Sequence, residues 1–214
     1  MKQLQLTPPL LILTMGYPGS GKTYFARQFA DEYKLARISE DRIRFELFEK
    51  PTFAAEEFEI IQRMGMYMVE QLMQTKQTIV YDGMFLQTHE RLQVQQLAKQ
   101  NGYRVLIVWL QTDIETSAQR ANQRDRRNPD SKYSFSLDRQ TFDAVRSTLQ
   151  RPHEKDSVVV ISGKHANKSQ CLTVLRKITT VYSENLGKGR PATPAHSRAS
   201  TDRPNVRPGQ RFVQ

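Results

Sequence analysis

An eight-residue segment near the start of the chain has the composition and spacing of a phosphate-binding loop. In such loops, glycines let backbone N–H groups curl around phosphate oxygens, a lysine adds positive charge, and the hydroxyl residue after it can hold Mg²⁺. Lys22 is expected to reach the β- and γ-phosphates of a nucleoside triphosphate, and Thr23 to hold the metal. The complete Walker A segment, which we predict to bind ATP, is Gly16, Tyr17, Pro18, Gly19, Ser20, Gly21, Lys22 and Thr23.

The residues on either side of this loop predict the local structure that it requires. Residues 10–15 form an apolar run typical of a buried parallel strand. After the loop, apolar residues recur at the spacing of a helix, namely Phe25, Ala26, Phe29, Ala30 and Tyr33. A helix N-terminus adds partial positive charge beside the phosphates. The alternative, a glycine-rich turn whose Lys22 is merely solvated, is disfavoured by this strand–loop–helix context.

A second set of polar residues follows the strand-like run at residues 35–39. Transfer of a phosphoryl group to an alcohol needs a carboxylate that orients the attacking hydroxyl and accepts its proton. Asp41 is our candidate for this base. Arg44 comes three residues later, on the same helical face, and could hold a phosphate or hydroxyl of the acceptor. The alternative is that Asp41 only caps the helix that follows.

Asp82 ends another apolar run, residues 78–81. Ligands of open α/β sheets bind beyond the carboxyl ends of the strands, and P-loop proteins commonly place an acid there near Mg²⁺. We therefore predict that Thr23 and Asp82 hold Mg²⁺. Two alternatives remain for Asp82, which could instead bind the acceptor or cap a turn at Gly83.

Four arginines lie close together in a polar segment: Arg120, Arg124, Arg126 and Arg127. The spacing of Arg120, Arg124 and Arg127 predicts that they share one face of a helix over residues 114–127. Like charges this close repel one another unless an anion neutralises them, and guanidinium groups pair well with phosphate. We predict that Arg120 or Arg124 closes over the γ-phosphate. The alternative is a solvated helix face paired with nearby acids.

Strand-like apolar runs alternate with helical patterns, which predicts an α/β fold with a mainly parallel sheet flanked by helices. The longest helix is expected over residues 54–76, with an apolar face made of Phe58, Ile61, Met64, Met68, Val69 and Leu72. Further strands are expected at residues 105–110 and 158–161, and further helices at residues 42–48, 88–100, 142–149 and 171–182.

The composition indicates a protein of the cytoplasm. A single cysteine, Cys171, excludes an internal disulfide and is typical of a reducing compartment. No segment is long and apolar enough for a membrane span or a signal peptide, so no membrane partner is expected. The four histidines are scattered without the spacing of a zinc site.

The formal net charge of +10 is unevenly distributed, with +6 spread over the long body of the chain and a denser share at its end. Residues 184–214 carry six Lys/Arg against two Asp/Glu, which gives +4, together with four of the ten prolines. Few large apolar residues occur there, so we predict a disordered tail after a domain that covers residues 1–183. The tail is either simply solvated or a nucleic-acid-binding arm.

These motifs together resemble the small P-loop kinase superfamily, which includes the kinase domain of phage polynucleotide kinase, zeta toxins and chloramphenicol phosphotransferase. Within it, the chain is most similar to bacterial predicted kinases with an AAA-type label. The resemblance covers residues 10–163. It rests on the Walker loop, the Asp41-x-x-Arg44 element, the Asp82 strand with Arg91 beyond it, and the segments at residues 120–124 and 149–154.

The resemblance implies a three-layer P-loop NTPase fold, adenylate-kinase-like, with ATP and Mg²⁺ as cofactors. It also implies a kinase that transfers the γ-phosphoryl group to a hydroxyl, with Asp41 as base and Arg44 in contact with the acceptor. The acceptor is not identified, and a polynucleotide 5′-hydroxyl and a small metabolite both remain open. Family members with different acceptors diverge in the segment between Asp41 and Asp82, and nothing in this segment of the chain identifies either kind of acceptor. Oligomeric state does not follow from the sequence.

Two other classes of function remain open. One is an NTPase that hydrolyses ATP without an acceptor to drive a conformational change. The other is a nucleic-acid-binding module that uses ATP as a switch, which the basic tail suggests. Slow ATP hydrolysis in the absence of acceptor distinguishes a kinase from such an NTPase. Salt-sensitive binding to RNA or DNA that needs the tail would indicate the nucleic-acid-binding module.

Overall fold

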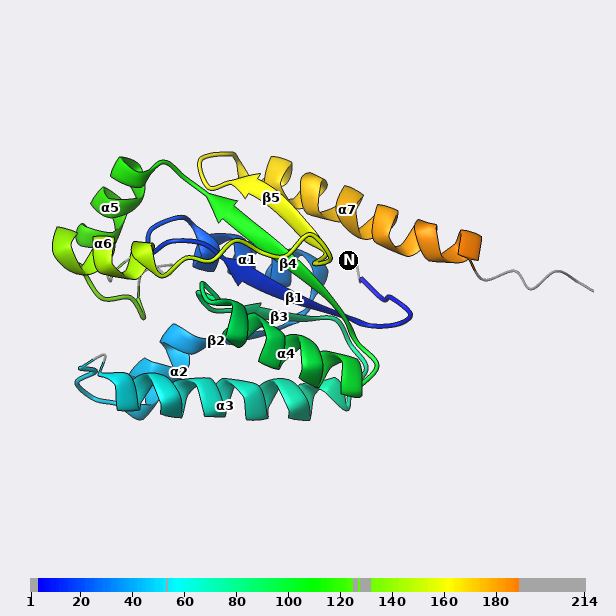
Figure 1. The fold of residues 1–214 in the computed structure, drawn as a ribbon, viewed down its shortest axis with the longest axis horizontal. Helices are drawn as coiled ribbons and strands as arrows, with labels where there is room; N and C mark the ends of the chain where they lie inside the picture. Colours follow the sequence, from blue (N-terminus) through cyan, green and yellow to red (C-terminus); the bar gives the residue numbers. More distant parts are fainter. Residues whose placement is uncertain (1–3, 53, 125–126, 128–131, 189–214) are drawn as a thin grey trace, which may run out of the picture.

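The computed structural model describes residues 4–52, 54–124, 127 and 132–188 (Figure 1). The strands are β1 (Leu10–Met15), β2 (Ala36–Ser39), β3 (Ile79–Asp82), β4 (Arg104–Gln111) and β5 (Val158–Ser162). The helices are α1 (Lys22–Tyr33), α2 (Glu40–Leu47), α3 (Ala55–Met73), α4 (Thr88–Gln100), α5 (Ile114–Asn122), α6 (Arg139–Ser147) and α7 (Asn167–Lys188).

Within these residues, the five strands form one parallel sheet in the order β2-β3-β1-β4-β5. The chain leaves β1 for β2 at the edge, returns to β3 beside β1, and then crosses to β4 on the other side. The chain therefore leaves β1 toward β2 and leaves the neighbouring strand β4 in the opposite direction, toward β5. This divergence opens a crevice at the carboxyl ends of these two strands. The predicted α/β fold with a central parallel sheet, of the P-loop NTPase type, is confirmed.

Helices cover both faces of the sheet, which makes the three layers (Figure 1). Successive strand residues point to opposite faces, so each strand supplies both cores. On one face, Leu10 and Ile12 of β1 pack with Phe25 and Phe29 of α1 and with Val174 of α7. On the other face, the neighbouring β1 residues Leu11 and Leu13 join a core that also contains Ile61, Val69, Val94 and Ala98 from α3 and α4.

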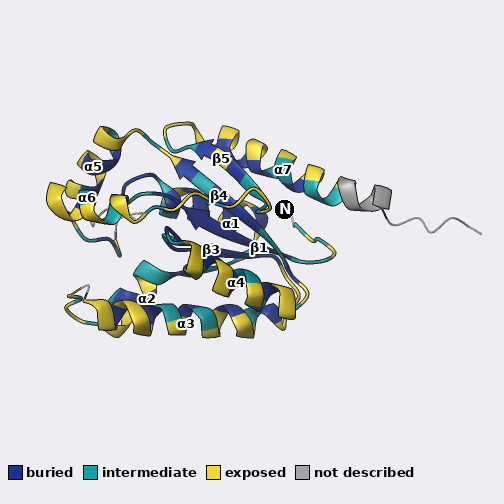
Figure 2. Ribbon diagram, in the orientation of Figure 1, coloured by how far each residue is buried: buried dark blue, intermediate teal, exposed yellow. Residues whose placement is uncertain are grey.

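The buried stripe of α3 agrees only in part with the predicted one. Ile61 and Val69 are buried as predicted, and Gly65 and Met73 are buried in the same row, four residues apart. Three residues assigned to the apolar face are outside the buried core, namely Phe58 at 41% exposed, Met64 at 37% and Met68 at 38%. Figure 2 shows the exposed outer side of the helix. The cause is a close approach at Gly65, where a Cβ would lie 2.1 Å from the Tyr81 hydroxyl oxygen. That contact fixes which side of α3 meets the sheet.

Among the other predicted boundaries, two change in ways that affect the site and the tail. α5 ends at Asn122 instead of residue 127, which removes Arg124 and Arg127 from the helix. α7 continues to Lys188, so helical backbone includes the first five residues assigned to the tail. The rest of the predicted disordered tail, residues 189–214, lies outside the described residues. In the part of the chain that the structure describes, no helix has the length and apolar character of a membrane span.

Candidate active site

The Walker segment forms a tight loop between β1 and α1 that is closely packed from outside. Gly19 and Gly21 have φ angles of 76° and 100°, a region that favours glycine. A Cβ on Gly19 would lie 2.1 Å from the carbonyl oxygen of Ser117 in α5. The Thr112 hydroxyl also donates to the Ser20 carbonyl at 3.1 Å. The loop is therefore shaped by its glycines and held in place by the β4–α5 region.

Lys22 is the first residue of α1, and its side chain folds back over the loop. Its Nζ donates to the carbonyl oxygens of Gly16 at 2.9 Å and Tyr17 at 2.8 Å. Burial lowers the pKa of Lys22 to about 8, against the opposing effect of the carboxylates Asp82 and Asp41. The ammonium is thus held where phosphate oxygens can replace carbonyl oxygens as its partners.

Thr23 and Asp82 meet at the carboxyl end of β3. Asp82 is buried, and it accepts hydrogen bonds from Arg37 Nη1 at 3.1 Å and from the Thr14 hydroxyl at 3.4 Å. Burial raises the pKa of Asp82 to about 6, while Arg37 and a hydrogen bond from the Thr23 hydroxyl lower it.

The oxygens of Thr23 and Asp82 suit a magnesium ion. Mg²⁺ commonly takes one or two protein oxygens and completes its shell with water and phosphate oxygens. Among the described residues no cluster of three or more His, Cys, Asp or Glu side chains forms a closed metal site. A hydroxyl and a carboxylate beside a phosphate-binding loop therefore fit a metal that arrives with the nucleotide.

Asp41 lies at the start of α2, but it does not cap the helix. The N-cap is Ser39, whose hydroxyl accepts from the backbone N–H of Arg42 at 3.4 Å. The alternative role of Asp41 as a simple cap is therefore wrong. Asp41 keeps 41% of its side chain exposed and lines the main pocket of the described residues. Burial raises its pKa, and Lys22, Arg44 and Arg124 act in the opposite direction.

Arg44 is buried behind Asp41. Its Nη1 lies 3.7 Å from Asp41 Oδ1, and its guanidinium carbon lies 4.4 Å from the centre of the Phe58 ring. The spacing-based expectation that Asp41 and Arg44 share a helix face is confirmed by this ion pair. Arg44 is thus fixed between a carboxylate and an aromatic ring, where it can orient Asp41.

Glu40 is a pocket residue that the sequence analysis did not select. Burial, together with the neighbouring Asp41 and Glu90 carboxylates, raises its pKa to about 8. The Tyr81 hydroxyl lies close enough to oppose this shift, although the contact lacks the geometry of a full hydrogen bond. A Cβ on Gly83 would lie 2.8 Å from Glu40 Oε2. Its position after a strand was visible in the sequence, but it was not visible that both adjacent acids line the pocket.

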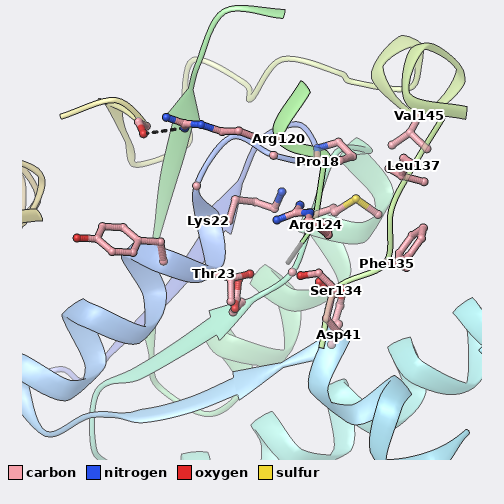
Figure 3. Close-up of a pocket in the computed structure, with 18 of the residues that line it drawn as sticks. Pro18, Lys22, Thr23, Asp41, Arg120, Arg124, Ser134, Phe135, Leu137 and Val145 are labelled. Carbon is pink, nitrogen blue, oxygen red and sulfur yellow. Dashed lines mark hydrogen bonds between the residues drawn. The ribbon is translucent and has the colours of Figure 1, made fainter. Parts of the chain in front are cut away.

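Arg120 and Arg124 reach the pocket from different local structures. Arg120 is in α5 and donates to the Gly163 carbonyl at 3.2 Å, the contact drawn as a dashed line in Figure 3. Arg124 follows the helix, and its side chain lies beside Lys22 (Figure 3). Its Nε is buried and has no hydrogen-bond partner among the described residues. Burial lowers the pKa of Arg124, whereas Asp41 raises it.

The predicted arginine face is therefore wrong in its geometry. Arg120 and Arg124 both line the pocket, but they do not share a helix face. The helix ends at Asn122, and the turn that follows it brings Arg124 to the pocket. Arg127 is exposed, and Arg126 lies outside the described residues. An anion in the pocket would gain a guanidinium from each of two directions.

These side chains surround one pocket of about 630 Å³, within the range of small-molecule sites. The predicted residues that line it are Pro18, Gly19, Gly21, Lys22, Thr23, Asp41, Arg44, Asp82, Arg120 and Arg124. Gly16, Tyr17 and Ser20 shape the loop without lining the pocket. Ser134, Phe135, Leu137 and Val145 form a further wall, and Figure 3 shows Ser134 beside Asp41. No sequence motif marked that wall.

The parallel sheet and the glycine loop between β1 and α1 define a P-loop fold. The sequence profile of an AAA domain family matches residues 11–152. The chain belongs to this AAA domain family. Among curated proteins, none matches the sequence significantly.

Solved structures share the fold at low sequence identity. A gluconokinase from Sinorhizobium meliloti 1021 is 13% identical with a TM-score of 0.62, over 86% of this chain and 99% of that chain. The Mycobacterium tuberculosis APS kinase CysC, in complex with AMPPNP and APS, is 14% identical with a TM-score of 0.60, over 80% and 98%. Chaetomium thermophilum Kti12, in complex with ADP-AlF3, is 18% identical with a TM-score of 0.63, over 79% and 97%.

Proposed function

We propose that this protein is an ATP-dependent kinase that transfers the γ-phosphoryl group to a hydroxyl of a small acceptor. The observation that carries the proposal is the position of Asp41. A partly exposed carboxylate lines the same pocket as the phosphate-binding loop, and it is held by Arg44 and free of any capping role. A water-hydrolysing P-loop protein does not need this arrangement, whereas an alcohol acceptor does.

Each group has a role that follows from its chemistry. The loop N–H groups and Lys22 hold the phosphates, and Arg120 and Arg124 neutralise negative charge that develops during transfer. Thr23 and Asp82 would hold Mg²⁺, which supplies charge neutralisation at the phosphates. Arg44 acts through Asp41 by keeping the carboxylate directed at the acceptor.

The transfer step is a balanced displacement. The acceptor oxygen forms a bond to the γ-phosphorus, and the bond between that phosphorus and the β,γ-bridging oxygen breaks. ADP leaves with the electron pair of the broken bond. The proton of the acceptor hydroxyl passes to the Asp41 carboxylate. Positioning and electrostatics account for most of the rate increase in such reactions.

The competing NTPase function predicts a different response to acceptor. For a kinase, ATP turnover should be slow in the absence of acceptor and should rise when the right hydroxyl compound is added. Fast turnover that no acceptor changes would overturn the kinase proposal. A nucleic-acid role for the basic tail and a cytoplasmic location remain predictions from composition, and the tail lies mostly outside the described residues.

A further inference from the structure

The pocket has a second half that the phosphates of ATP do not need. One half is made by the Walker loop with Lys22, Arg120 and Arg124. The other half lies beyond Asp41, between the start of α2, α3, the turn after β3 and the wall at Ser134 and Phe135. In Figure 3, Ser134 lies beside Asp41 and Phe135 lies near Ser134, whereas Leu137 and Val145 lie beside Pro18 of the Walker loop. An acceptor that presents a hydroxyl to Asp41 must occupy this second half.

The charges in this half do not favour an anionic acceptor. Its carboxyl groups are Glu40 and Asp41, and the cation among its described lining residues is Arg44. Arg44 is buried, ion-paired with Asp41 and stacked on Phe58, so its charge is already balanced. A phosphate or carboxylate on the acceptor would therefore find no described cation on this side whose charge is not already balanced by a carboxylate. Such burial of unpaired charge is costly.

The charges do not favour a cationic acceptor either. Asp41 already interacts with Lys22, Arg44 and Arg124, which leaves little negative potential for another cation. Burial holds the pKa of Glu40 near 8, so its carboxyl is mainly protonated at neutral pH and can both donate and accept a hydrogen bond. This half of the pocket is therefore close to electrically neutral and rich in hydrogen-bonding oxygens.

Beside the Ser134 hydroxyl, the remaining lining of this half is largely apolar. Its apolar side chains are Phe58, Met84 and Phe135. Aromatic and aliphatic side chains need a ligand surface of C–H groups, whereas Glu40 and Asp41 need hydroxyl groups. A molecule with one face of C–H groups and an edge of hydroxyls satisfies both.

We propose, on the basis of the kinase function above, that the acceptor is an uncharged polyhydroxylated molecule, a sugar or polyol. Its hydroxyl edge contacts Glu40 and Asp41, and its C–H face packs on Phe58 and Phe135. Glu40 is then a specificity-determining residue, and Gly83 leaves the room that the Glu40 carboxyl occupies.

The test follows γ-labelled phosphate from ATP onto acceptors that share a carbon skeleton and differ in charge. The set is D-glucose, D-glucuronate, D-glucose 6-phosphate and D-glucosamine, extended with pentoses, hexitols and inositols. We expect label on neutral members, with kcat/KM at least tenfold above that of any charged counterpart. Preferential labelling of an acidic, phosphorylated or amino member overturns the inference and leaves the kinase proposal intact. Absence of label on the whole set with slow ATP hydrolysis also overturns it, whereas rapid acceptor-independent hydrolysis overturns the kinase proposal itself.

Variants locate the site. Glu40→Gln should raise KM for the neutral acceptor about tenfold with a smaller effect on kcat and on ATP affinity, because it changes a hydrogen bond to the acceptor. Glu49 is an exposed acid just beyond α2, and Glu49→Gln is the matched control that should leave KM, kcat and ATP affinity unchanged. Phe58→Leu should raise the same KM, while Tyr67→Leu on the outer side of α3, 58% exposed, should not. Equal effects of Glu40→Gln and its control would remove Glu40 from the acceptor site.

Discussion

At the scale of single residues, the site depends on carboxyl groups whose pKa values are raised by burial. Glu40, Asp41 and Asp82 follow the ends of two neighbouring parallel strands, and all three line one pocket with Lys22. Perturbed titration of several groups in one cleft is typical of functional sites. The types of these residues could be read from the sequence. Their burial and mutual distances could not, because both depend on which strands become neighbours.

Asp41→Asn tests the role of the proposed base. We expect kcat for acceptor phosphorylation to fall by about 10²–10⁴, because an amide cannot take the proton. ATP affinity, measured by titration calorimetry, should remain close to that of the wild type. Asp31→Asn, an exposed acid at the end of α1, is the control and should leave both values unchanged. A collapse of ATP affinity with normal turnover of bound ATP would assign Asp41 a structural role.

Glu40 should also leave a signature in the pH dependence of stability. Its pKa in the folded protein is about 8, above the ordinary value of 4.5, so the folded state holds this proton more tightly than the unfolded state. Its contribution to stability is therefore fully present below about pH 4.5 and is lost as pH rises toward 8. Relative to wild type, Glu40→Gln should gain stability steadily across this range, as measured by urea unfolding. Parallel curves for the two proteins would contradict the raised pKa.

At the scale of elements, the sequence predicted the strands and the long helices well because their apolar patterns are local. It failed where tertiary packing decides the outcome. The close approach of Tyr81 to Gly65 sets the rotation of α3, and the end of α5 at Asn122 redirects Arg124 into the pocket. Neither contact leaves a periodic signal. The same reason explains why the wall at residues 134–145 was not predicted as part of the site.

Gly19→Ala tests how the Walker loop is supported by α5. The new Cβ would lie 2.1 Å from the Ser117 carbonyl oxygen, so the loop or α5 must shift. We expect at least a tenfold loss of ATP affinity and a clear fall in melting temperature. Gly102→Ala separates this clash from backbone strain, since Gly102 has a nearly equal φ of 75° but no atom within 4 Å of the new Cβ. Similar behaviour of the two variants would show that the contact with α5 is unimportant.

At the scale of the whole molecule, the described cores and the pocket are built by one continuous part of the chain. The residues of the two sheet-facing cores all precede position 183. The proposed division into a kinase domain over residues 1–183 and a basic tail therefore needs one adjustment, because α7 continues to Lys188. The motifs of the sequence predicted a class of reaction, which stays a proposal, but the acceptor depends on the shape and charge of a pocket built from distant segments.

Removal of residues 189–214 tests the independence of the domain. Because the described cores and pocket lie before this segment, the shortened protein should keep its melting temperature and its ATP affinity within error. Differential scanning calorimetry and nucleotide titration would measure both. A fall of several degrees would show that the tail contributes to the folded domain.

The central claim is that this pocket transfers the γ-phosphoryl group of ATP. The most direct measurement compares label transfer to acceptor by the wild type and by Lys22→Ala, with ATP binding measured in parallel and Lys34→Ala, an exposed lysine after α1, as control. The account predicts acceptor-dependent transfer by the wild type and the control, and a loss of about 10²–10³ or more with weaker ATP binding in Lys22→Ala. Transfer at the wild-type rate by Lys22→Ala would contradict it.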